Sequence, residues 1–195
     1  MSGNDITIVS GLPRSGTSLM MQMLQAGGLP LLTDGRRTPD ESNPRGYFEH
    51  DAVKQGCNDL SWLDQAGGKA VKVIHVLLLH LPAQRNYRVI FMVRNLEEVI
   101  ASQRAMLKQQ GRAAATLTDA ALAGIFEKQL ATVRQWLAAQ HNFRVLYVNH
   151  RDVITQPLAA AGQINQFLGG NLSVDSMVAA MNPELYRQRK PVPVN

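Results

Sequence analysis

Residues 11–18, GLPRSGTS, constrain the fold of this chain more than any other stretch. They follow a short β-rich run that ends in glycine, DITIVSG, and they precede TSLMMQMLQAGG, in which Leu19, Met20, Met23 and Leu24 share one helical face. A strand, a glycine-rich loop and a helix in this order are typical of the phosphate-binding start of an α/β domain. The stretch therefore predicts an anion site at the end of a first strand.

The loop matches the phosphate-loop pattern G-x-x-x-x-G-K-[S/T], except that Thr17 stands in place of the lysine. A nucleotide-cleaving loop uses that lysine on the β- and γ-phosphates, so the loop is expected to hold a different phosphate ligand. Backbone N–H groups and the helix N-terminus would form the cradle. The predicted contacts are the positive charge of Arg14, the backbone of Gly16, and the hydroxyls of Ser15, Thr17 and Ser18.

Strand-like and helix-like segments alternate after the loop. YRVIFMV is nearly all apolar, as a strand buried on both faces should be. The alternation predicts a single domain over residues 1–195, with three α/β/α layers and a mainly parallel central sheet of P-loop type, whose ligands bind at the carboxyl ends of the strands. The predicted strands are 5–11, 69–74, 87–93 and 143–148, and the predicted helices are 17–28, 75–82, 95–111, 118–140 and 157–170.

The composition is that of an ordinary globular protein, with 45% hydrophobic and 18% charged residues among 195. The apolar runs are too short to span a bilayer, the first residues lack a secretory signal, and Cys57 has no disulfide partner. These features favour a cytoplasmic protein. The net charge of +5 arises without a dense basic run, and the arginines are scattered over loops. A small polyanionic ligand is therefore expected rather than nucleic acid.

A second candidate anion site lies in VIFMVRNLEEVIAS. Arg94 follows the apolar strand, and Asn95 with Glu98 three residues later resembles a capping box at the start of the next helix. Ser102 lies on the second turn of that helix. A phosphate held by the Arg94 guanidinium could also accept a hydrogen bond from the Ser102 hydroxyl.

Together these motifs resemble the sulfotransferase family, in particular its bacterial and tyrosylprotein-type members. PRSGTSL is similar to that family's loop for the 5′-phosphosulfate of 3′-phosphoadenosine 5′-phosphosulfate (PAPS), and VRNLEEVIAS is similar to its 3′-phosphate motif. NFRVLYVNHRDVITQPLAAAGQINQFLG resembles a later strand and helix, although residues 150–153 depart from the usual tyrosine-acidic-aspartate-leucine run. The resemblance spans roughly residues 5–170. It implies PAPS as cosubstrate, PAP (3′-phosphoadenosine 5′-phosphate) as product, and no metal.

The resemblance also implies catalytic residues. Arg14 would stabilise charge in place of the missing lysine, and Lys72 matches the lysine that contacts the leaving phosphate, although the usual aspartate-proline after it is absent. Related bacterial sequences draw attention to NPRGYFEH, in which Glu49 is the first choice for the base that takes the acceptor proton. The other candidates for the base are Asp34, Asp40 and His50.

Further expectations concern the acceptor and the C-terminal tail. The acceptor would be a hydroxyl or amine on a small molecule, glycan, lipid or peptide, with its site built partly by the long polar loop 33–50 or by a second copy of the chain. Tyr186 is expected to stack on the adenosine, and Arg187 or Arg189 to contact phosphate. His75 and His80 are expected to be packed residues of an apolar helix.

Two other functions fit the same residues. A small-molecule P-loop kinase would require ATP and Mg²⁺, and Thr17 in place of lysine argues against it. A non-catalytic module would bind PAP or another nucleotide without turnover.

Overall fold

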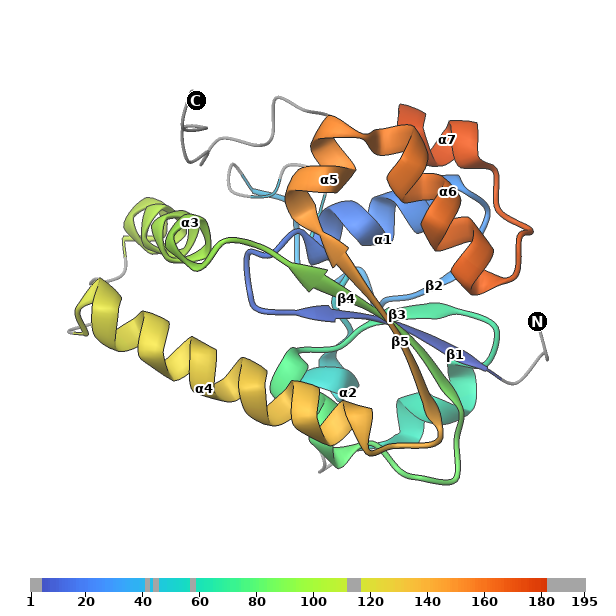
Figure 1. Ribbon diagram of the computed structural model, residues 1–195, viewed down its shortest axis with the longest axis horizontal. Helices are drawn as coiled ribbons and strands as arrows, with labels where there is room; N and C mark the ends of the chain where they lie inside the picture. The colour runs from blue at the N-terminus through green and yellow to red at the C-terminus, as the bar shows by residue number, and fades with distance from the viewer. Residues whose placement is uncertain (1–4, 41–42, 44–45, 57–58, 112–116, 182–195) are drawn as a thin grey trace.

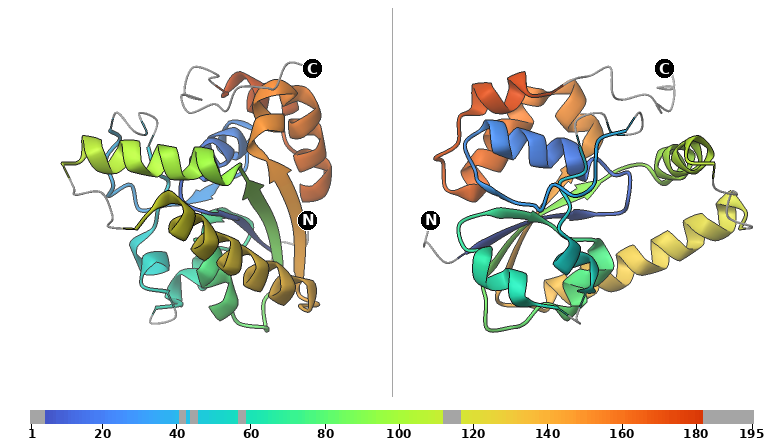
Figure 2. Two further views of the ribbon diagram at one scale, coloured as in Figure 1. Left: turned by 60° about the vertical axis from the view of Figure 1, so that its left-hand side comes forward. Right: turned by 180° about the vertical axis from the view of Figure 1, so that it is seen from behind.

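A computed structural model of the 195-residue chain describes residues 5–40, 43, 46–56, 59–111 and 117–181. Its centre is a five-stranded sheet in which every pairing is parallel, in the order β2-β3-β1-β4-β5. Helices lie on both faces of the twisted sheet (Figures 1 and 2), so the predicted α/β/α layers are confirmed. The strands are β1 (Ile6–Gly11), β2 (Leu31–Leu32), β3 (Ala70–Lys72), β4 (Tyr87–Val93) and β5 (Phe143–Asn149).

Alternate residues of the central strands enter two separate cores. Ile8 and Phe91 face one core, whereas Val9 and Ile90 face the other, and all four are fully buried. This period of two is the pleat of a strand with both faces covered. The nearly all-apolar pattern of β4 therefore reflects burial on both faces, as predicted.

The core on the α1 side packs three helices against the sheet. Met20, Met23 and Leu24 of α1 are fully buried there, so the predicted apolar face of that helix is confirmed. The helices of this layer are α1 (Thr17–Ala26), α6 (Pro157–Leu168) and α7 (Val174–Ala179), with the short α5 (His150–Thr155) beside them.

The opposite core packs α4 (Asp119–Ala138) and two 3₁₀ helices, η2 (Ser61–Gln65) and η3 (His75–His80), against the sheet, with α2 (Asp51–Lys54) beside them. α3 (Leu96–Gln109) packs on α4 through a smaller cluster that includes Leu12 and Phe126. Asn95 caps α3 with side-chain hydrogen bonds, as the sequence predicts, and Thr118 caps α4 in the same way.

Several elements differ from the predicted ones. β2 lies at the edge of the sheet and was not predicted. A strand of two residues is too short to produce a periodic sequence pattern. The helix predicted at 75–82 is a 3₁₀ helix, in which His75 is buried and bonded to Gln129 at 3.0 Å, whereas His80 is exposed. The prediction of packing is therefore correct for His75 and wrong for His80. The two residues are five positions apart in a helix with three residues per turn, so their side chains point in different directions.

Candidate active site

The backbone conformation of the loop 11–18 requires glycine at two positions. Gly11 has φ 145°, and a Cβ there would lie 2.6 Å from the carbonyl oxygen of Met92. Gly16 has φ 98° and caps α1, and a Cβ there would overlap the ring of His150. Both glycines of the pattern are therefore required by left-handed backbone and by close neighbours. Arg14 also has a positive φ, 69°, between them.

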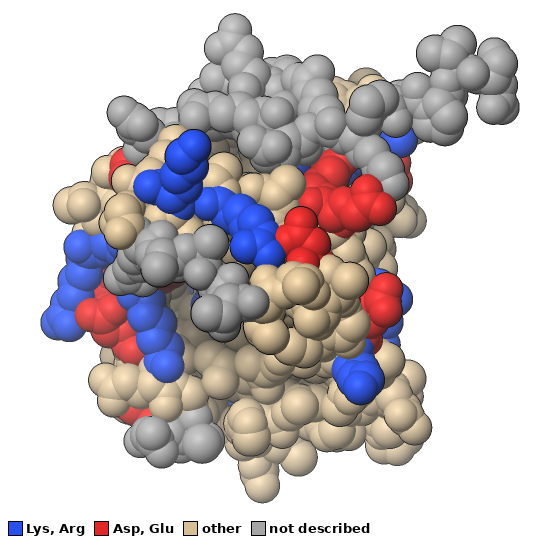
Figure 3. Space-filling model, turned by 90° about the vertical axis from the view of Figure 1, so that its left-hand side faces the viewer, with Lys and Arg blue, Asp and Glu red and all other residues tan. Residues whose placement is uncertain are grey.

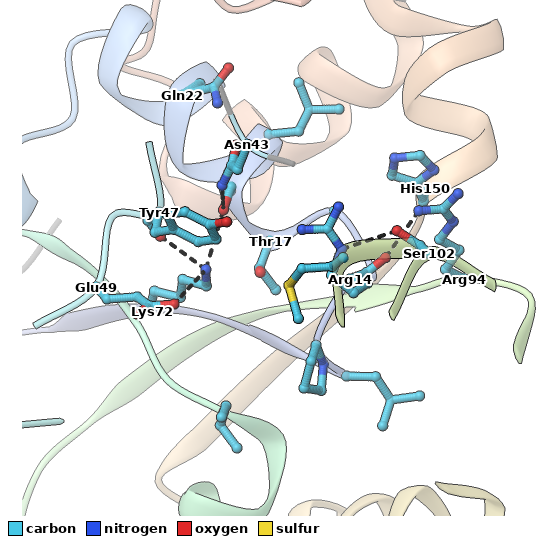
Figure 4. Close-up of a pocket in the computed structure, with 18 of the residues that line it drawn as sticks. Arg14, Thr17, Gln22, Asn43, Tyr47, Glu49, Lys72, Arg94, Ser102 and His150 are labelled. Carbon is cyan, nitrogen blue, oxygen red and sulfur yellow. Dashed lines mark hydrogen bonds and ion pairs between the residues drawn. The ribbon is translucent and has the colours of Figure 1, made fainter. Parts of the chain in front are cut away.

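A cavity of about 380 Å³ opens above this loop, and its wall includes Thr17, Lys72, Arg94 and His150. Gly11 ends β1, Lys72 ends β3, Arg94 follows β4 and His150 follows β5. The cavity thus lies at the carboxyl ends of four parallel strands, where ligands of open α/β sheets bind. Figure 4 shows two groups of polar side chains on opposite sides of this space, with Thr17 between them.

The first group contains two arginines. Arg14 donates from Nε to Ser102 Oγ at 3.0 Å, and Arg94 donates from Nη1 to the Arg14 carbonyl oxygen at 3.0 Å. Arg94 Nε also forms an ion pair with Glu98 Oε2 at 3.0 Å, and both of these side chains are only 9% exposed. His150 lies beside them (Figure 4), and burial followed by the charge of Arg94 lowers its pKa to about 4. The ring is therefore neutral near pH 7.

The second group surrounds Lys72. Its ammonium donates to the Tyr47 carbonyl oxygen at 2.9 Å and to Ser18 Oγ at 3.2 Å, and it lies 3.8 Å from Glu49 Oε1. Asn43 Nδ2 donates to the same Ser18 hydroxyl at 2.9 Å. The structure therefore connects β3, the loop hydroxyl and the 33–50 segment at one side of the cavity.

Glu49 is held by three cations. Arg37 Nη1 lies 3.0 Å from Oε1, Lys54 Nζ lies 3.1 Å from Oε2, and Lys72 follows at 3.8 Å. The Arg37 guanidinium also stacks 3.3 Å from the centre of the Tyr47 ring. These contacts fix the carboxylate at the cavity wall.

The other candidate bases lie elsewhere. Asp34 accepts backbone N–H bonds from Arg36 at 3.1 Å and Asp51 at 2.6 Å, and both carboxylate oxygens of Asp40 accept from the Tyr47 hydroxyl at 2.7 Å. Among the described residues that form the cavity wall, Glu49 is present, whereas Asp34, Asp40 and His50 are not.

The remaining predicted contacts divide into three sets. Thr17 and Ser18 line the cavity, as does Ser102, which is 6% exposed. Ser15 is buried away from that wall, and its hydroxyl has no hydrogen-bond partner within the described ranges. The predicted tail contacts, Tyr186, Arg187 and Arg189, lie outside the described residues.

Several wall residues were missed by sequence reasoning, although two signals were present. Arg37, Asn43 and Tyr47 lie in the polar loop 33–50, which was expected to build part of the site, and His150 occupies the position where the family run changes. Gln22 and Met106 gave no signal, because they reach the cavity only through the tertiary fold.

The pKa of Lys72 predicts a pH dependence. Burial, only partly offset by the charge of Glu49, lowers this pKa to about 8. Above pH 8 Lys72 of the unliganded protein loses its proton and its positive charge. An anion that pairs with the Lys72 ammonium must then bind together with a proton. The affinity for an anion that contacts Lys72, with PAP as the probe, is therefore expected to fall by up to about tenfold per pH unit above 8. Isothermal titration calorimetry across pH 7–10 measures this, and Lys72→Arg should bind with no such fall because arginine stays charged.

Figure 3 shows one face of the molecule with basic and acidic side chains interspersed. The coloured part of this view has no continuous basic surface of the kind that binds a nucleic-acid backbone. Across the described residues, no three His, Cys, Asp or Glu side chains are grouped so as to hold a metal ion. No helix within the same ranges is long and apolar enough to cross a membrane.

Residues 4–188 match the sulfotransferase domain family, so the chain belongs to this family. The sulfotransferase domain of the Synechococcus PCC 7002 olefin synthase has a similar structure, with a TM-score of 0.57 and 16% identity over 98% of this chain and 90% of that one. The sulfotransferase domain of the curacin biosynthetic pathway has a TM-score of 0.57 and 14% identity, over 98% of this chain and 94% of that one. Mouse sulfotransferase SULT7A1, complexed with PAP, has a TM-score of 0.60 and 18% identity, over 95% of this chain and 65% of that one.

The TM-scores establish a shared fold, and at identities of 14–18% they show the fold alone. Among curated proteins, none is significantly similar in sequence.

Proposed function

We propose that this protein transfers a sulfuryl group from PAPS to a hydroxyl or amine acceptor. The observation that carries the proposal is one cavity with a basic cluster on each side. Arg14, Arg94 and Ser102 lie on one side, and Lys72 with Glu49 lies on the other. PAPS carries a 3′-phosphate and a 5′-phosphosulfate, so two separated groups of cations and hydroxyls suit its two anionic ends.

The structural neighbours support the same ligand. The mouse sulfotransferase was determined with PAP, and a retinol dehydratase with PAP as an inactive cofactor has a TM-score of 0.52 at 14% identity over 96% of this chain and 65% of that one. PAP is what remains of PAPS after the sulfuryl group has left. Thr17 in place of the phosphate-loop lysine also fits a reaction that moves a sulfuryl rather than a phosphoryl group.

The chemistry needs a base and a cation at the reacting end. Glu49 takes the proton of the acceptor hydroxyl as its oxygen attacks sulfur, and the bond between sulfur and the 5′-phosphate oxygen breaks. The ammonium of Lys72 donates to that leaving oxygen and stabilises the negative charge that develops on it. Thr17 and Ser18, with the backbone N–H groups at the start of α1, hold the 5′-phosphate.

The acceptor enters from the side of the cavity formed by the 33–50 loop. Asn43, Tyr47 and Glu49 line that side, next to Lys72. The acceptor class that we propose is a small molecule, glycan, lipid or peptide bearing a free hydroxyl or amine.

Thermal denaturation of the full chain with PAP, PAPS, ATP, or ATP with Mg²⁺ tests the proposal. PAP at about 100 times its Kd should raise the midpoint by about 5–10 °C, because a ligand that binds only the native state stabilises it. The shift should persist in excess EDTA, since basic side chains and N–H groups hold the ligand. A shift that requires Mg²⁺ and is largest with ATP would instead identify a kinase. PAP binding without transfer to any screened acceptor would identify a non-catalytic module.

A further inference from the structure

Gln22 is a buried polar side chain of the cavity wall that none of the steps above uses. It belongs to α1 and is 9% exposed. Its Oε1 is shielded from water and accepts no hydrogen bond from the described residues. A carboxamide oxygen that has left water without gaining a partner costs free energy. A ligand in the cavity that donates a hydrogen bond to this oxygen recovers that cost.

The position of Gln22 assigns it to one side of the cavity. Residues four positions apart on a helix share a face, so Gln22 lies on the same face of α1 as Ser18. The Ser18 hydroxyl accepts from Asn43 Nδ2 at 2.9 Å and from Lys72 Nζ at 3.2 Å. Figure 4 shows Gln22 on the same side of the space as Asn43 and Lys72. Gln22 therefore borders the side of the cavity from which the acceptor is proposed to enter.

The chemistry of Gln22 suits a neutral hydroxyl better than a phosphate. The N–H groups that can hold a phosphate lie in the first turn of α1, and Gln22 follows Ser18 by one further turn, roughly 6 Å along the axis. An amide oxygen accepts from a hydroxyl, and the amide NH₂ donates to the same kind of group. The terminal torsion of a glutamine is broad, so the carboxamide can turn either atom toward the cavity. Asn43 supplies a second carboxamide on this side.

We propose that Gln22, together with Asn43, binds a second hydroxyl of the acceptor, adjacent to the group that receives the sulfuryl. The inference rests on the proposed function, because it specifies the acceptor of the same site. It narrows the acceptor to a molecule with neighbouring hydroxyls, such as a sugar or another polyol. A hydroxyl both donates and accepts, which matches a carboxamide with one acceptor and two donors. Gln22 thus selects the acceptor and takes no part in proton transfer.

Two pairs of acceptor probes test the inference in the full chain. Cyclohexane-1,2-diol and methyl glucopyranoside carry neighbouring hydroxyls, whereas cyclohexanol and tetrahydropyran-4-ol carry one. Single-turnover transfer of labelled sulfate from PAPS, measured against probe concentration, gives a specificity constant for each. The parent should prefer the first two probes by more than their larger number of hydroxyls explains. Gln22→Met, which roughly conserves volume, should reduce this preference by about 3- to 10-fold, the usual loss for a neutral hydrogen bond.

Gln25→Met is the matched control. Gln25 lies on the same helix but is exposed and is not among the described residues that line the cavity, so this variant should keep the parent preference. Gln22→Met should melt at the parent temperature or above it, because an apolar side chain replaces a buried amide oxygen without a described partner. A Gln22→Met variant that keeps the full preference overturns the inference. Equal slowing with all four probes, together with a lower melting temperature, overturns it too, because it shows a structural role.

Failure of this inference differs from failure of the proposed function. A parent protein that sulfates the probes with one hydroxyl as well as those with neighbouring hydroxyls contradicts the inference alone. The same holds if it sulfates none of the four probes but does sulfate another acceptor found by screening. A parent that transfers sulfate from PAPS to no screened acceptor contradicts the proposed function itself, whether or not it binds PAP.

Discussion

Glu49→Gln is expected to slow sulfuryl transfer by about 10²- to 10⁴-fold, the contribution of a positioned general base. The amide keeps the shape of the carboxylate but cannot take the acceptor proton. Glu49 is 20% exposed at the cavity wall and lies 3.8 Å from Lys72 Nζ, which is the proximity that the proposed roles of base and cation require. The measurement is single-turnover transfer of labelled sulfate from PAPS to an acceptor found by screening, with PAP affinity determined in parallel.

Two carboxylates of the same segment serve as controls for Glu49. Asp34→Asn and Asp40→Asn neutralise charges that hydrogen-bond within the segment and do not line the cavity. Each should slow transfer far less than Glu49→Gln. If Glu49→Gln transfers at the parent rate and one of these variants does not, the base has been misassigned.

Lys72→Met is expected to slow transfer by about 10²- to 10³-fold, the usual cost of removing one preorganised donor to a developing negative charge. Methionine keeps much of the length and apolar character of the side chain, so the replacement chiefly removes the ammonium. PAP affinity should fall by a smaller factor than the rate, because the charge on the leaving oxygen is greatest in the transition state. The same single-turnover assay and PAP titration give both numbers.

Lys54→Met is the matched control for Lys72. Lys54 also pairs with Glu49, at 3.1 Å, but its side chain is 47% exposed and does not line the cavity. An exposed ion pair contributes little, so this variant should retain most of the transfer rate. Equal losses for the two lysines would mean that Lys72 acts through Glu49 alone. A Lys72→Met variant whose PAP affinity falls as much as its rate would show that Lys72 serves binding only.

The proposed mechanism divides the work between segments that are distant in sequence. β1 and the loop after it provide the phosphate cradle, and β4 with α3 provides Arg94 and Ser102. β3 provides Lys72, and the 33–50 loop places Glu49 beside it. Because parallel strands all end at one edge of the sheet, these contributions meet there.

Local sequence patterns determined the framework of this protein. The loop 11–18 requires glycine at two positions where backbone is left-handed and neighbours are close, so its spacing is readable without tertiary information. The apolar strand β4 and the caps Asn95 and Thr118 are likewise local, since side-chain periodicity and capping depend on residues a few positions apart. The parallel sheet and the meeting of Arg94 and Ser102 in the cavity were predicted in this way.

The tertiary structure alone decided which side chains meet. The stretch NPRGYFEH made Glu49 the first choice over Asp34 and Asp40, but only the fold of the 33–50 loop shows that Glu49 is the one of the three that lies beside Lys72. β2, two residues long, is a strand only because β3 pairs with it. The side chain of Arg14 bonds to Ser102 and its carbonyl oxygen bonds to Arg94, although both partners are 80 or more positions away. Such contacts depend on how separate elements pack, and a pattern that spans a few residues carries no information about that packing.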